Sequence, residues 1–290
     1  MTKSEPFVSV LMTAYNREKY IGEAIESVLA STYTDFELII VDDASSDNTV
    51  AIAKTYAAND NRIKIYVNER NLGDYPNRNK AASYANGRYL KYVDSDDLIE
   101  PEALDIMAMA MISNPDVALG LSTREKLVNR KDYLKLTATE SYRKHFFHLG
   151  ILSMGPSFAI ISNEVFQREK GFLEIRNVSD TELWLRIASR NNIIQFSDSL
   201  IKWREHEHQE FRIAPEYYLA NNYKILYEKL MSKDCPLTKP EVDIILKKEK
   251  KMIVGAVIKF GIKKFKPLTA YKYLKNQNLT LADLFVVFKK

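Results

Sequence analysis

The chain has 290 residues, of which 46% are hydrophobic and 28% are charged. This composition excludes an intrinsically disordered chain, and the small numbers of glycines and prolines exclude a collagen-like one. A single cysteine, Cys235, excludes an internal disulfide framework and a cysteine-rich zinc site. We see no secretory leader and no apolar run close to the ~20 residues that span a bilayer, so the sequence predicts a cytoplasmic protein.

The charge is divided unevenly along the chain. Residues 242–290 contain 12 lysines and 3 acidic residues, which leaves 30 basic and 35 acidic residues in the rest. Because a nucleic-acid binder needs a basic face, this acidic main body predicts no nucleic-acid partner. The basic carboxyl-terminal region has to be interpreted by itself.

Strand-like and helix-like segments alternate through the first hundred residues. Short runs rich in apolar and β-branched residues predict buried strands at 7–13, 36–41, 63–67 and 88–93. Helical spacing, N-cap residues and Pro101 predict helices at 21–29, after 46–48, at 78–85 and from 101. Strands separated by helices of this length predict parallel βαβ units and therefore an α/β sheet.

The remainder of the chain is less regular up to residue 212 and helical beyond it. Strands are predicted at 116–122, 155–161, 193–196 and 199–203. Helices are predicted at 141–149, 178–190, 217–230, 240–260 and 268–274. The sequence thus predicts an α/β body over residues 1–212 and a basic helical region over 213–290.

Three polar clusters stand where predicted strands end. They are Ala14-Tyr15-Asn16, Asp42-Asp43 and Asp94-Ser95-Asp96-Asp97. In parallel sheets, ligands bind beyond the carboxyl ends of the strands. The convergence of three polar clusters on that edge predicts a binding site.

Asp94 and Asp96 are separated by one residue and follow a buried strand, where an unpaired carboxylate is costly. Both side chains can turn toward one point and share a hard divalent cation, Mg²⁺ or Mn²⁺, whose coordination substrate phosphates usually complete. The alternative is that these aspartates cap the helix near Pro101, a role that suits Asp97 in particular.

Other polar residues allow both a structural and a ligand-binding role. One of Asp42 and Asp43 can cap the next helix while the other accepts a hydrogen bond from a nucleotide base, on which Tyr15 could stack. Asp180 begins a helix and can be an ordinary first-turn acid. His206 lies in a charged loop, where a histidine is usually solvated. Both common phosphate-binding glycine loops are absent, so metal and arginine would have to neutralise a phosphate-bearing ligand.

The chain resembles the family 2 glycosyltransferases, which are inverting enzymes with the GT-A fold. The resemblance rests on VSVLMTAYNREKYIGEAIESVLASTYTDFELIIVDDASSDNT (8–49), NRNKAASYANGRYLKYVDSDDLIEP (77–101) and SDTELWLRIA (179–188). It implies that residues 1–212 form a GT-A domain, with a nucleotide-binding half at 1–97 and an acceptor half at 98–212. Residues 213–290 follow as a separate basic helical region.

The resemblance also implies roles for individual residues. The nucleotide sugar would bind Thr13, Ala14, Tyr15, Arg17, Asp43, Arg78, Asp94 and Ser95. Asp94, Asp96 and His206 would hold the Mn²⁺ or Mg²⁺, and Asp180 matches the catalytic base. The chain departs from the family pattern at Ala44, where glycine is common, and at Ser179, where an acidic residue is common.

The implied reaction is inverting transfer of a sugar from a nucleotide-diphosphate sugar to a hydroxyl of a saccharide or lipid-linked acceptor. UDP is favoured through Asp43, and polysaccharide or glycoconjugate biosynthesis is the implied setting. Two rival functions stay open. A sugar-nucleotidyltransferase should have a glycine-rich loop, which is missing, and a non-catalytic nucleotide- or carbohydrate-binding subunit would not need Asp94, Asp96 and Asp180.

The basic region 242–290 has two interpretations. Between Ile244 and Phe265, apolar residues alternate with lysines, a pattern that can lie on an anionic membrane surface at the inner face of the membrane. That placement would suit a lipid-linked acceptor. The alternative is a helix that packs on the catalytic domain and exposes its lysines to solvent.

Overall fold

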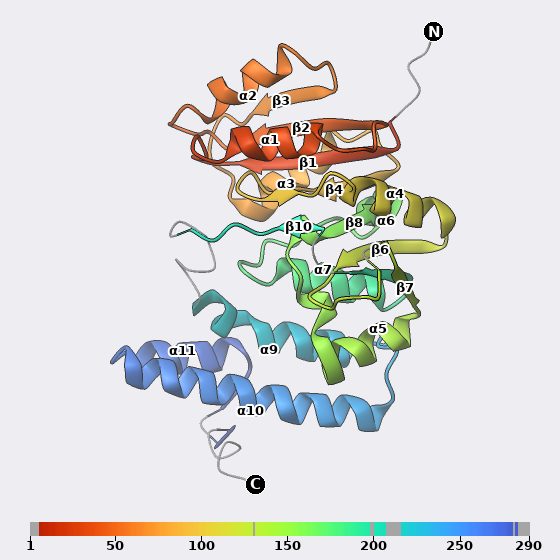
Figure 1. Ribbon diagram of the computed structural model, residues 1–290. Coiled ribbons are helices and arrows are strands. Elements are labelled where there is room, and N and C mark those ends of the chain that lie inside the picture. Colours follow the sequence, from red (N-terminus) through yellow and green to blue (C-terminus); the bar gives the residue numbers. More distant parts are fainter. Residues whose placement is uncertain (1–5, 130, 198–199, 207–215, 281, 284–290) are drawn as a thin grey trace.

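The structure is a computed structural model that describes residues 6–129, 131–197, 200–206, 216–280 and 282–283. Its centre is an eight-stranded sheet in the order β3-β2-β1-β4-β8-β6-β9-β7 (Figure 1). The strands are β1 Val8–Ala14, β2 Phe36–Asp42, β3 Ile63–Val67, β4 Tyr89–Tyr92, β6 Val117–Ser122, β7 Tyr133–Leu136, β8 Ala159–Ser162 and β9 Asn192–Phe196. Only β8 and β7 among them run antiparallel to their neighbours, so the predicted mostly parallel α/β sheet is confirmed.

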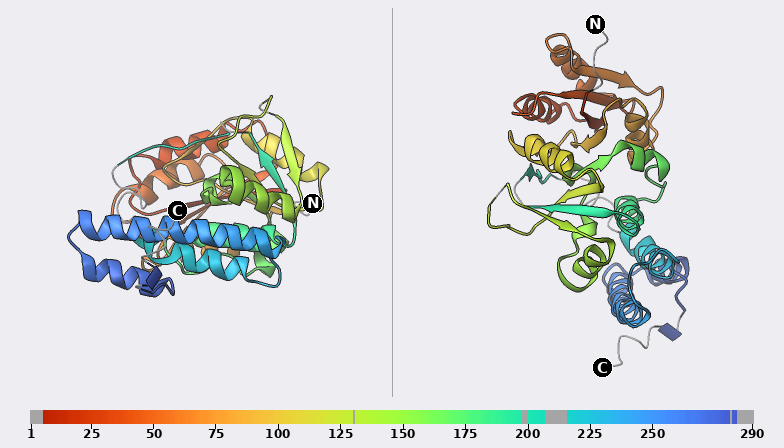
Figure 2. Two further views of the ribbon diagram at one scale, coloured as in Figure 1. Left: turned by 90° about the horizontal axis from the view of Figure 1, so that it is seen from below. Right: turned by 90° about the vertical axis from the view of Figure 1, so that its right-hand side faces the viewer.

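Helices cover both faces of the sheet (Figure 2). They are α1 Ile21–Leu29, α2 Thr49–Ala57, α3 Asp74–Ser83, α4 Ala103–Ser113, α5 Ala138–Lys144, α6 Asn163–Arg168 and α7 Ser179–Ala188. One core cluster joins α1, α2 and α4 to Val10 and Leu38, and the other joins α3, α5, α6 and α7 to Leu11 and Ile39. Adjacent strand residues thus enter opposite clusters, as the two-residue period of a strand requires.

Most predicted elements agree with the structure, and the differences have local causes. α3 begins at Asp74, earlier than the predicted start at 78, because Gly73 turns the chain at φ 92° and Pro76 fits the first helical turn. α4 begins at Ala103 after a turn at Pro101, so this proline precedes the helix instead of opening it.

The sequence did not reveal the shortest elements. β5 (Leu98–Ile99) pairs with β10 (Ile201–Lys202) in a separate antiparallel sheet. β5, β7 and α6 were not predicted, because segments of two to six residues give too little periodicity to be recognised. The β5–β10 pair matters for the site, since it brings the chain after Lys202 beside the chain before Leu98.

The carboxyl-terminal helices pack on the α/β body. α9 (Glu216–Leu230) and α10 (Lys239–Lys263) contribute Leu226, Leu230, Val242 and Ile245 to the core cluster that contains α7. A further cluster joins α9 and α10 to α11 (Pro267–Asn276). Within the described part of the chain, no helix is both long enough and apolar enough to cross a membrane. Because α10 contributes residues to both of these clusters, one side of the basic region packs within the protein.

The turn after β2 holds Ala44 at φ 62°, in the left-handed region that favours glycine. Ser45 N donates to Asp42 Oδ1 at 2.8 Å, so Asp42 closes this turn and does not cap α2. Thr49 N, at the start of α2, donates instead to Asp47 Oδ1 at 3.0 Å. The alanine at position 44 therefore carries a conformational cost of about 1 kcal/mol.

We expect Ala44→Gly to raise the free energy of unfolding by about 1 kcal/mol, because glycine adopts the left-handed conformation without a steric penalty. Urea unfolding followed by circular dichroism measures this change. Ala44→Val, which keeps the Cβ and adds bulk, is the matched control and should lower the free energy. A glycine variant no more stable than the natural protein would show that the turn is unstrained.

Candidate active site

A cleft of about 740 Å³ opens at the carboxyl edge of the sheet. Nine of the predicted site residues line it: Thr13, Ala14, Tyr15, Arg17, Asp43, Arg78, Asp94, Ser95 and Asp96. They come from the end of β1, from the segments that follow β1, β2 and β4, and from α3. The two remaining predicted residues, Asp180 and His206, are not among the residues that line the cleft. His206 contacts Asp96, and Asp180 has Asp74 and Arg78 as charged neighbours.

Arg78 holds two carboxylates at one side of the cleft. Its Nε donates to Asp74 Oδ1 at 2.7 Å, and its Nη1 donates to Asp94 Oδ1 at 2.6 Å. Burial acts to raise the pKa of Asp94, but the Arg78 guanidinium holds that pKa below its usual value. Asp74 and Arg78 lie four residues apart on α3, so the early start of this helix creates the pair.

Asp96 is held by residues from two distant segments. Its Oδ2 accepts a hydrogen bond from Arg17 Nε at 3.0 Å and lies 2.9 Å from His206 Nε2. The His206 ring stacks on Tyr20 with centroids 4.7 Å apart, and its side chain is only 7% exposed. His206 is therefore a buried neighbour of Asp96 and not a solvated loop residue.

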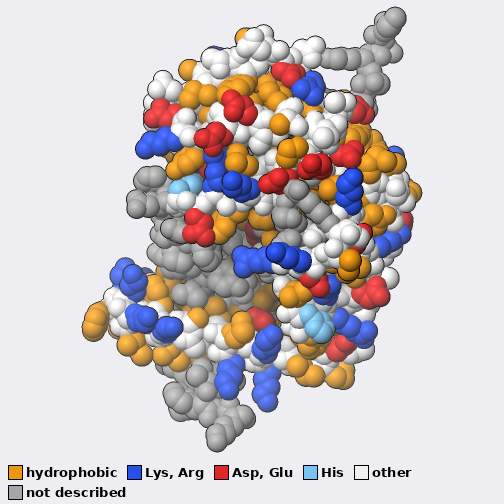
Figure 3. Space-filling model, in the orientation of Figure 1, with side chains coloured by type: hydrophobic (Ala, Val, Ile, Leu, Met, Phe, Trp, Pro, Cys, Tyr) orange, Lys and Arg blue, Asp and Glu red, His pale blue; other side chains and the backbone are white. Residues whose placement is uncertain are grey.

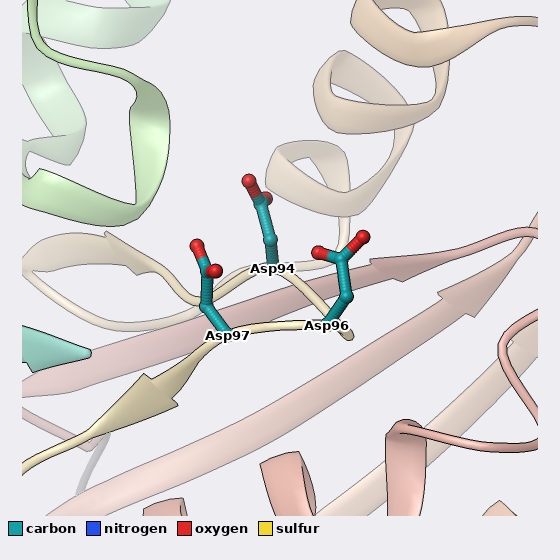
Figure 4. Close-up of side chains that lie close together, drawn as sticks. All are labelled: Asp94, Asp96 and Asp97. Carbon is teal, nitrogen blue, oxygen red and sulfur yellow. The ribbon is translucent and has the colours of Figure 1, made fainter. Parts of the chain in front are cut away.

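Asp94, Asp96 and Asp97 form one cluster of carboxylates just after β4 (Figure 4). One oxygen from each lies within 4.8 Å of the others, and the three side chains point to the same side of the loop. Burial and the charges of Asp94 and Asp96 raise the pKa of Asp97 to about 7. Crowded oxygen ligands that repel one another fit a hard divalent cation such as Mg²⁺ or Mn²⁺.

Asp97 does not cap the next helix, as one sequence interpretation allowed. α4 begins at Ala103 with Glu102 as its N-cap residue, several residues beyond Asp97. Asp97 Oδ1 instead accepts a hydrogen bond from Arg204 N at 3.2 Å. The β5–β10 pairing explains the difference, because it brings Arg204 to this carboxylate.

A segment from the second half of the chain is fastened to the aspartate cluster. Ser157 lies in a single 3₁₀ turn before β8, and its Oγ accepts a hydrogen bond from Asp94 N at 2.9 Å. The buried Lys91 Nζ donates to the carbonyl oxygens of Tyr92, at 2.8 Å, and of Ser157. Desolvation lowers the pKa of Lys91 to about 7. β4 and the segment that enters β8 are therefore fixed to each other at the cleft.

Asp43 shapes the other end of the cleft. Its Oδ1 accepts hydrogen bonds from Asn68 Nδ2 at 2.9 Å and Leu72 N at 2.8 Å, and its Oδ2 accepts one from Gly73 N at 2.9 Å. These bonds fix the loop that enters α3. Tyr15 lines the same cleft with 47% of its surface exposed, which leaves its ring accessible to a ligand.

Asp180 occupies the second position of α7. Burial raises the pKa of its carboxyl to about 7, against the lowering effect of the hydrogen bond from Thr181 N at 2.6 Å. Asp74 and Arg78 are its charged neighbours, which places Asp180 beside the ion pair at the side of the cleft. A carboxylate with a pKa near neutrality is well suited to accept a proton.

Comparison with known proteins assigns this geometry to a family. The model described as glycosyl transferase family 2 matches residues 9–170, which is more than half of the chain. The chain belongs to glycosyltransferase family 2. It is 33% identical to an uncharacterized glycosyltransferase of Methanocaldococcus jannaschii, over 69% of this chain and 71% of that protein.

A second relative of this glycosyltransferase has a more specific name. The Escherichia coli protein UDP-Glc:alpha-D-GlcNAc-diphosphoundecaprenol beta-1,3-glucosyltransferase WfgD is 31% identical, over 76% of this chain and 82% of that protein. Among solved structures, S. aureus TarS 1-349 in complex with UDP-GlcNAc is 20% identical with a TM-score of 0.67, over 97% of this chain and 90% of that one.

A mannosyltransferase from Pyrobaculum calidifontis, PcManGT in complex with GDP-Man and Mn²⁺, is 17% identical with a TM-score of 0.59. The likeness covers 99% of this chain and 87% of that one. At such identities the two solved structures establish a shared GT-A fold. The predicted family, fold and enzyme class are therefore confirmed.

Several residues that line the cleft of the glycosyltransferase were not predicted as site residues. They are Asn71, Leu72, Gly73, Asp74, Tyr75, Pro76, Asn77, Asp97, Glu174, Arg176, Asn177 and Trp203. In the sequence, residues 71–77 are a polar stretch rich in turn residues ahead of the predicted helix at 78–85, which is a usable signal for a binding loop, although the structure begins α3 at Asp74. Residues 174–177 and Trp203 carry no such signal, because only the tertiary structure brings them to the cleft.

We expect Arg78→Met to lower the free energy of unfolding of the glycosyltransferase by about 2 kcal/mol, because it leaves two partly buried carboxylates without their cation. Chemical denaturation measures the change. Arg143→Met is the matched control, since Arg143 is half exposed and pairs with Glu241 away from the cleft. That control should lose less than about 1 kcal/mol. Equal losses in the two variants would show that the Arg78 pairs are no stronger than a surface pair.

Proposed function

We propose that this glycosyltransferase moves a sugar, with inversion at the anomeric carbon, from a UDP-sugar to a hydroxyl of a saccharide or lipid-linked acceptor. The observation that carries the proposal is Asp180, a carboxylate whose pKa burial raises to about 7 beside a cleft of about 740 Å³. Ligand pockets for small molecules commonly have volumes of roughly 300–1,000 Å³. Asp180 is the base in this proposal, and the cleft holds the donor.

Arg17 and Arg78 are the cations that suit the diphosphate of the donor. Each guanidinium now binds a carboxylate, Arg17 at Asp96 and Arg78 at Asp94. Charge-assisted bonds from arginine to phosphate are as strong as those to carboxylate, so a diphosphate can share these donors. The nucleotide base would then contact the Tyr15 ring, the end of β1 and Asp43. The end of β1 carries Thr13 and Ala14, and Asp43 directly follows β2.

The choice of UDP is supported by the relative WfgD, whose name includes UDP-Glc and a diphosphoundecaprenol acceptor. A lipid-linked acceptor is proposed for the same reason. Asp94 and Asp96 would hold Mn²⁺ or Mg²⁺, with Asp97 and His206 close enough to assist, and a bound ion supplies positive charge to the diphosphate.

In the proposed reaction the acceptor oxygen attacks the anomeric carbon from the face opposite the diphosphate. The bond between this carbon and the diphosphate oxygen breaks as the glycosidic bond forms, and the diphosphate leaves with the electron pair. The proton of the acceptor hydroxyl passes to a carboxylate oxygen of Asp180. With a pKa of about 7, this carboxylate is a stronger base than an exposed aspartate would be.

We expect Asp180→Asn to lower kcat by about 10²–10⁴-fold while donor affinity changes little, because an amide cannot accept the proton. In the natural protein, kcat/KM should rise with pH around a midpoint near 7, since only the ionised form of Asp180 is a base. The variant should lose this rise. Steady-state kinetics across pH, with donor binding measured by calorimetry, test both statements.

Asp105→Asn is the matched control, because Asp105 also lies in the first turn of a helix but on α4. It should keep both the rate and the pH dependence. A variant at Asp180 that lost donor affinity, or that kept the rise of kcat/KM with pH, would contradict its assignment as the base.

Thermal unfolding with UDP-sugars and GDP-sugars, each with and without Mn²⁺, should show the largest stabilisation with a UDP-sugar plus metal. A ligand at 100 times its Kd stabilises a protein by about 2.7 kcal/mol, so the shift is measurable. Asp96→Ala should remove the metal-dependent part of the shift. Asp60→Ala is the control, since Asp60 pairs with Arg62 outside the cleft. A larger shift with GDP-sugars would overturn the choice of UDP.

A further inference from the structure

The connection between α10 and α11 exposes large apolar side chains together with lysines. Residues 262–268, which we name the α10–α11 corner, have the sequence IKKFKPL, and all seven are exposed. Ile262, Phe265 and Leu268 have exposed fractions of 69%, 91% and 77%. Hydrophobic and lysine side chains gather at the lower left of Figure 3, where α10 and α11 meet in the same orientation of Figure 1. An apolar group this exposed on a soluble surface indicates an interaction site.

Most of the apolar residues that the sequence pattern placed on one face of α10 are buried within the protein. Ile253, Val254 and Val257 are buried against α9 and α11. The predicted apolar stripe of α10 therefore faces the protein, and the helix does not offer that stripe to a membrane. Ile244 and Met252 are also exposed on α10, but the corner places three exposed large apolar residues within seven positions of the chain.

The backbone conformation at position 265 is unfavourable for the phenylalanine that stands there. Phe265 has φ 52°, and Lys266 N donates to Gly261 O at 3.0 Å, a helix ending that normally has glycine at the left-handed position. A phenylalanine there costs conformational energy, and with 91% exposure it gains almost no burial in return. Neither local conformation nor packing within the described chain accounts for an aromatic residue at this position.

The charge around the corner favours an anionic partner. From residue 250 to residue 282 the chain has eight lysines and no acidic residue. Lys263, Lys264 and Lys266 lie within the corner itself, between its apolar side chains. Long lysine side chains can place their ammonium groups at phosphate level while neighbouring apolar groups enter the acyl region.

We propose that the α10–α11 corner is a membrane anchor that inserts Ile262, Phe265 and Leu268 into the surface of an anionic bilayer. The corner lies at the left of Figure 1, on the side toward which the carboxyl end of β1 points. The same side carries the cleft, which is built on the carboxyl ends of the strands. Anchoring at the corner thus turns the cleft toward the bilayer rather than away from it. The anchor requires neither the proposed donor nor the proposed base.

Sedimentation with vesicles tests the anchor in the full-length protein. Binding should require phosphatidylglycerol in a phosphatidylcholine bilayer and should weaken with salt. Phe265→Gly should weaken binding about tenfold, since it removes one inserted aromatic side chain. Its thermal stability should be unchanged or higher, because the left-handed position favours glycine, so a loss of binding cannot be attributed to unfolding.

Ile244→Ser is the matched control, because Ile244 is 59% exposed near the other end of α10. It should bind vesicles like the natural protein. An equal loss in Ile244→Ser would overturn the corner in favour of the whole helix lying flat. A chain ending at Asp283 should also bind normally. Loss of binding in that chain would assign the membrane contact to residues 284–290, which lie outside the described residues, and would overturn the proposal.

Sugar transfer to a water-soluble acceptor separates this proposal from the proposed function. Phe265→Gly should keep this activity in solution while losing vesicle binding. Binding of the natural protein to phosphatidylcholine vesicles as strongly as to anionic ones would overturn the role of the lysines, and absence of binding to either would overturn the anchor.

Discussion

The ion pairs of Arg78 with Asp74 and Asp94 join α3 to the loop that follows β4, and the electrostatics of the cleft depend on them. Arg78 is buried and holds the pKa of Asp94 low, although burial acts in the opposite direction. The same guanidinium is a charged neighbour of Asp180. One cation thus acts on both the aspartate cluster and the proposed base, which makes the position of α3 critical for the site.

Two aspartates, Asp97 in the lining of the cleft and Asp180 near its residues Asp74 and Arg78, have a pKa of about 7 for different reasons. Burial and the negative charges of Asp94 and Asp96 raise the pKa of Asp97. The pKa of Asp180 is raised mainly by burial. A bound cation would relieve the repulsion at Asp97 but would leave the desolvation at Asp180 in place. Binding of the proposed cation would therefore leave the proposed base, Asp180, with its raised pKa.

Sequence patterns predicted the α/β sheet and the residues at the strand ends well, because both follow from local rules. Buried strands are apolar runs, and the carboxyl ends of parallel strands form one edge, so Asp43, Asp94 and Asp96 could be assigned together. The pattern failed where contacts join distant segments. Asp97 and His206 acquire their partners through the pairing of β5 with β10. β10 lies within the strand predicted at 199–203, but the two-residue β5 and its pairing with β10 could not be predicted. Cleft residues such as Trp203 were missed for the same reason.

The seam between the first and second halves of the sheet runs beside the cleft. β4 pairs antiparallel with β8 there, and the buried Lys91 and Ser157 bind across the seam. Lys91 belongs to the half that carries the aspartate cluster, but it is held by a carbonyl of the other half. The halves are therefore not interchangeable modules. A chimera that took residues 98–212 from a relative would leave the Lys91 ammonium facing a foreign backbone, and its complete burial excludes water as a substitute for the lost carbonyl.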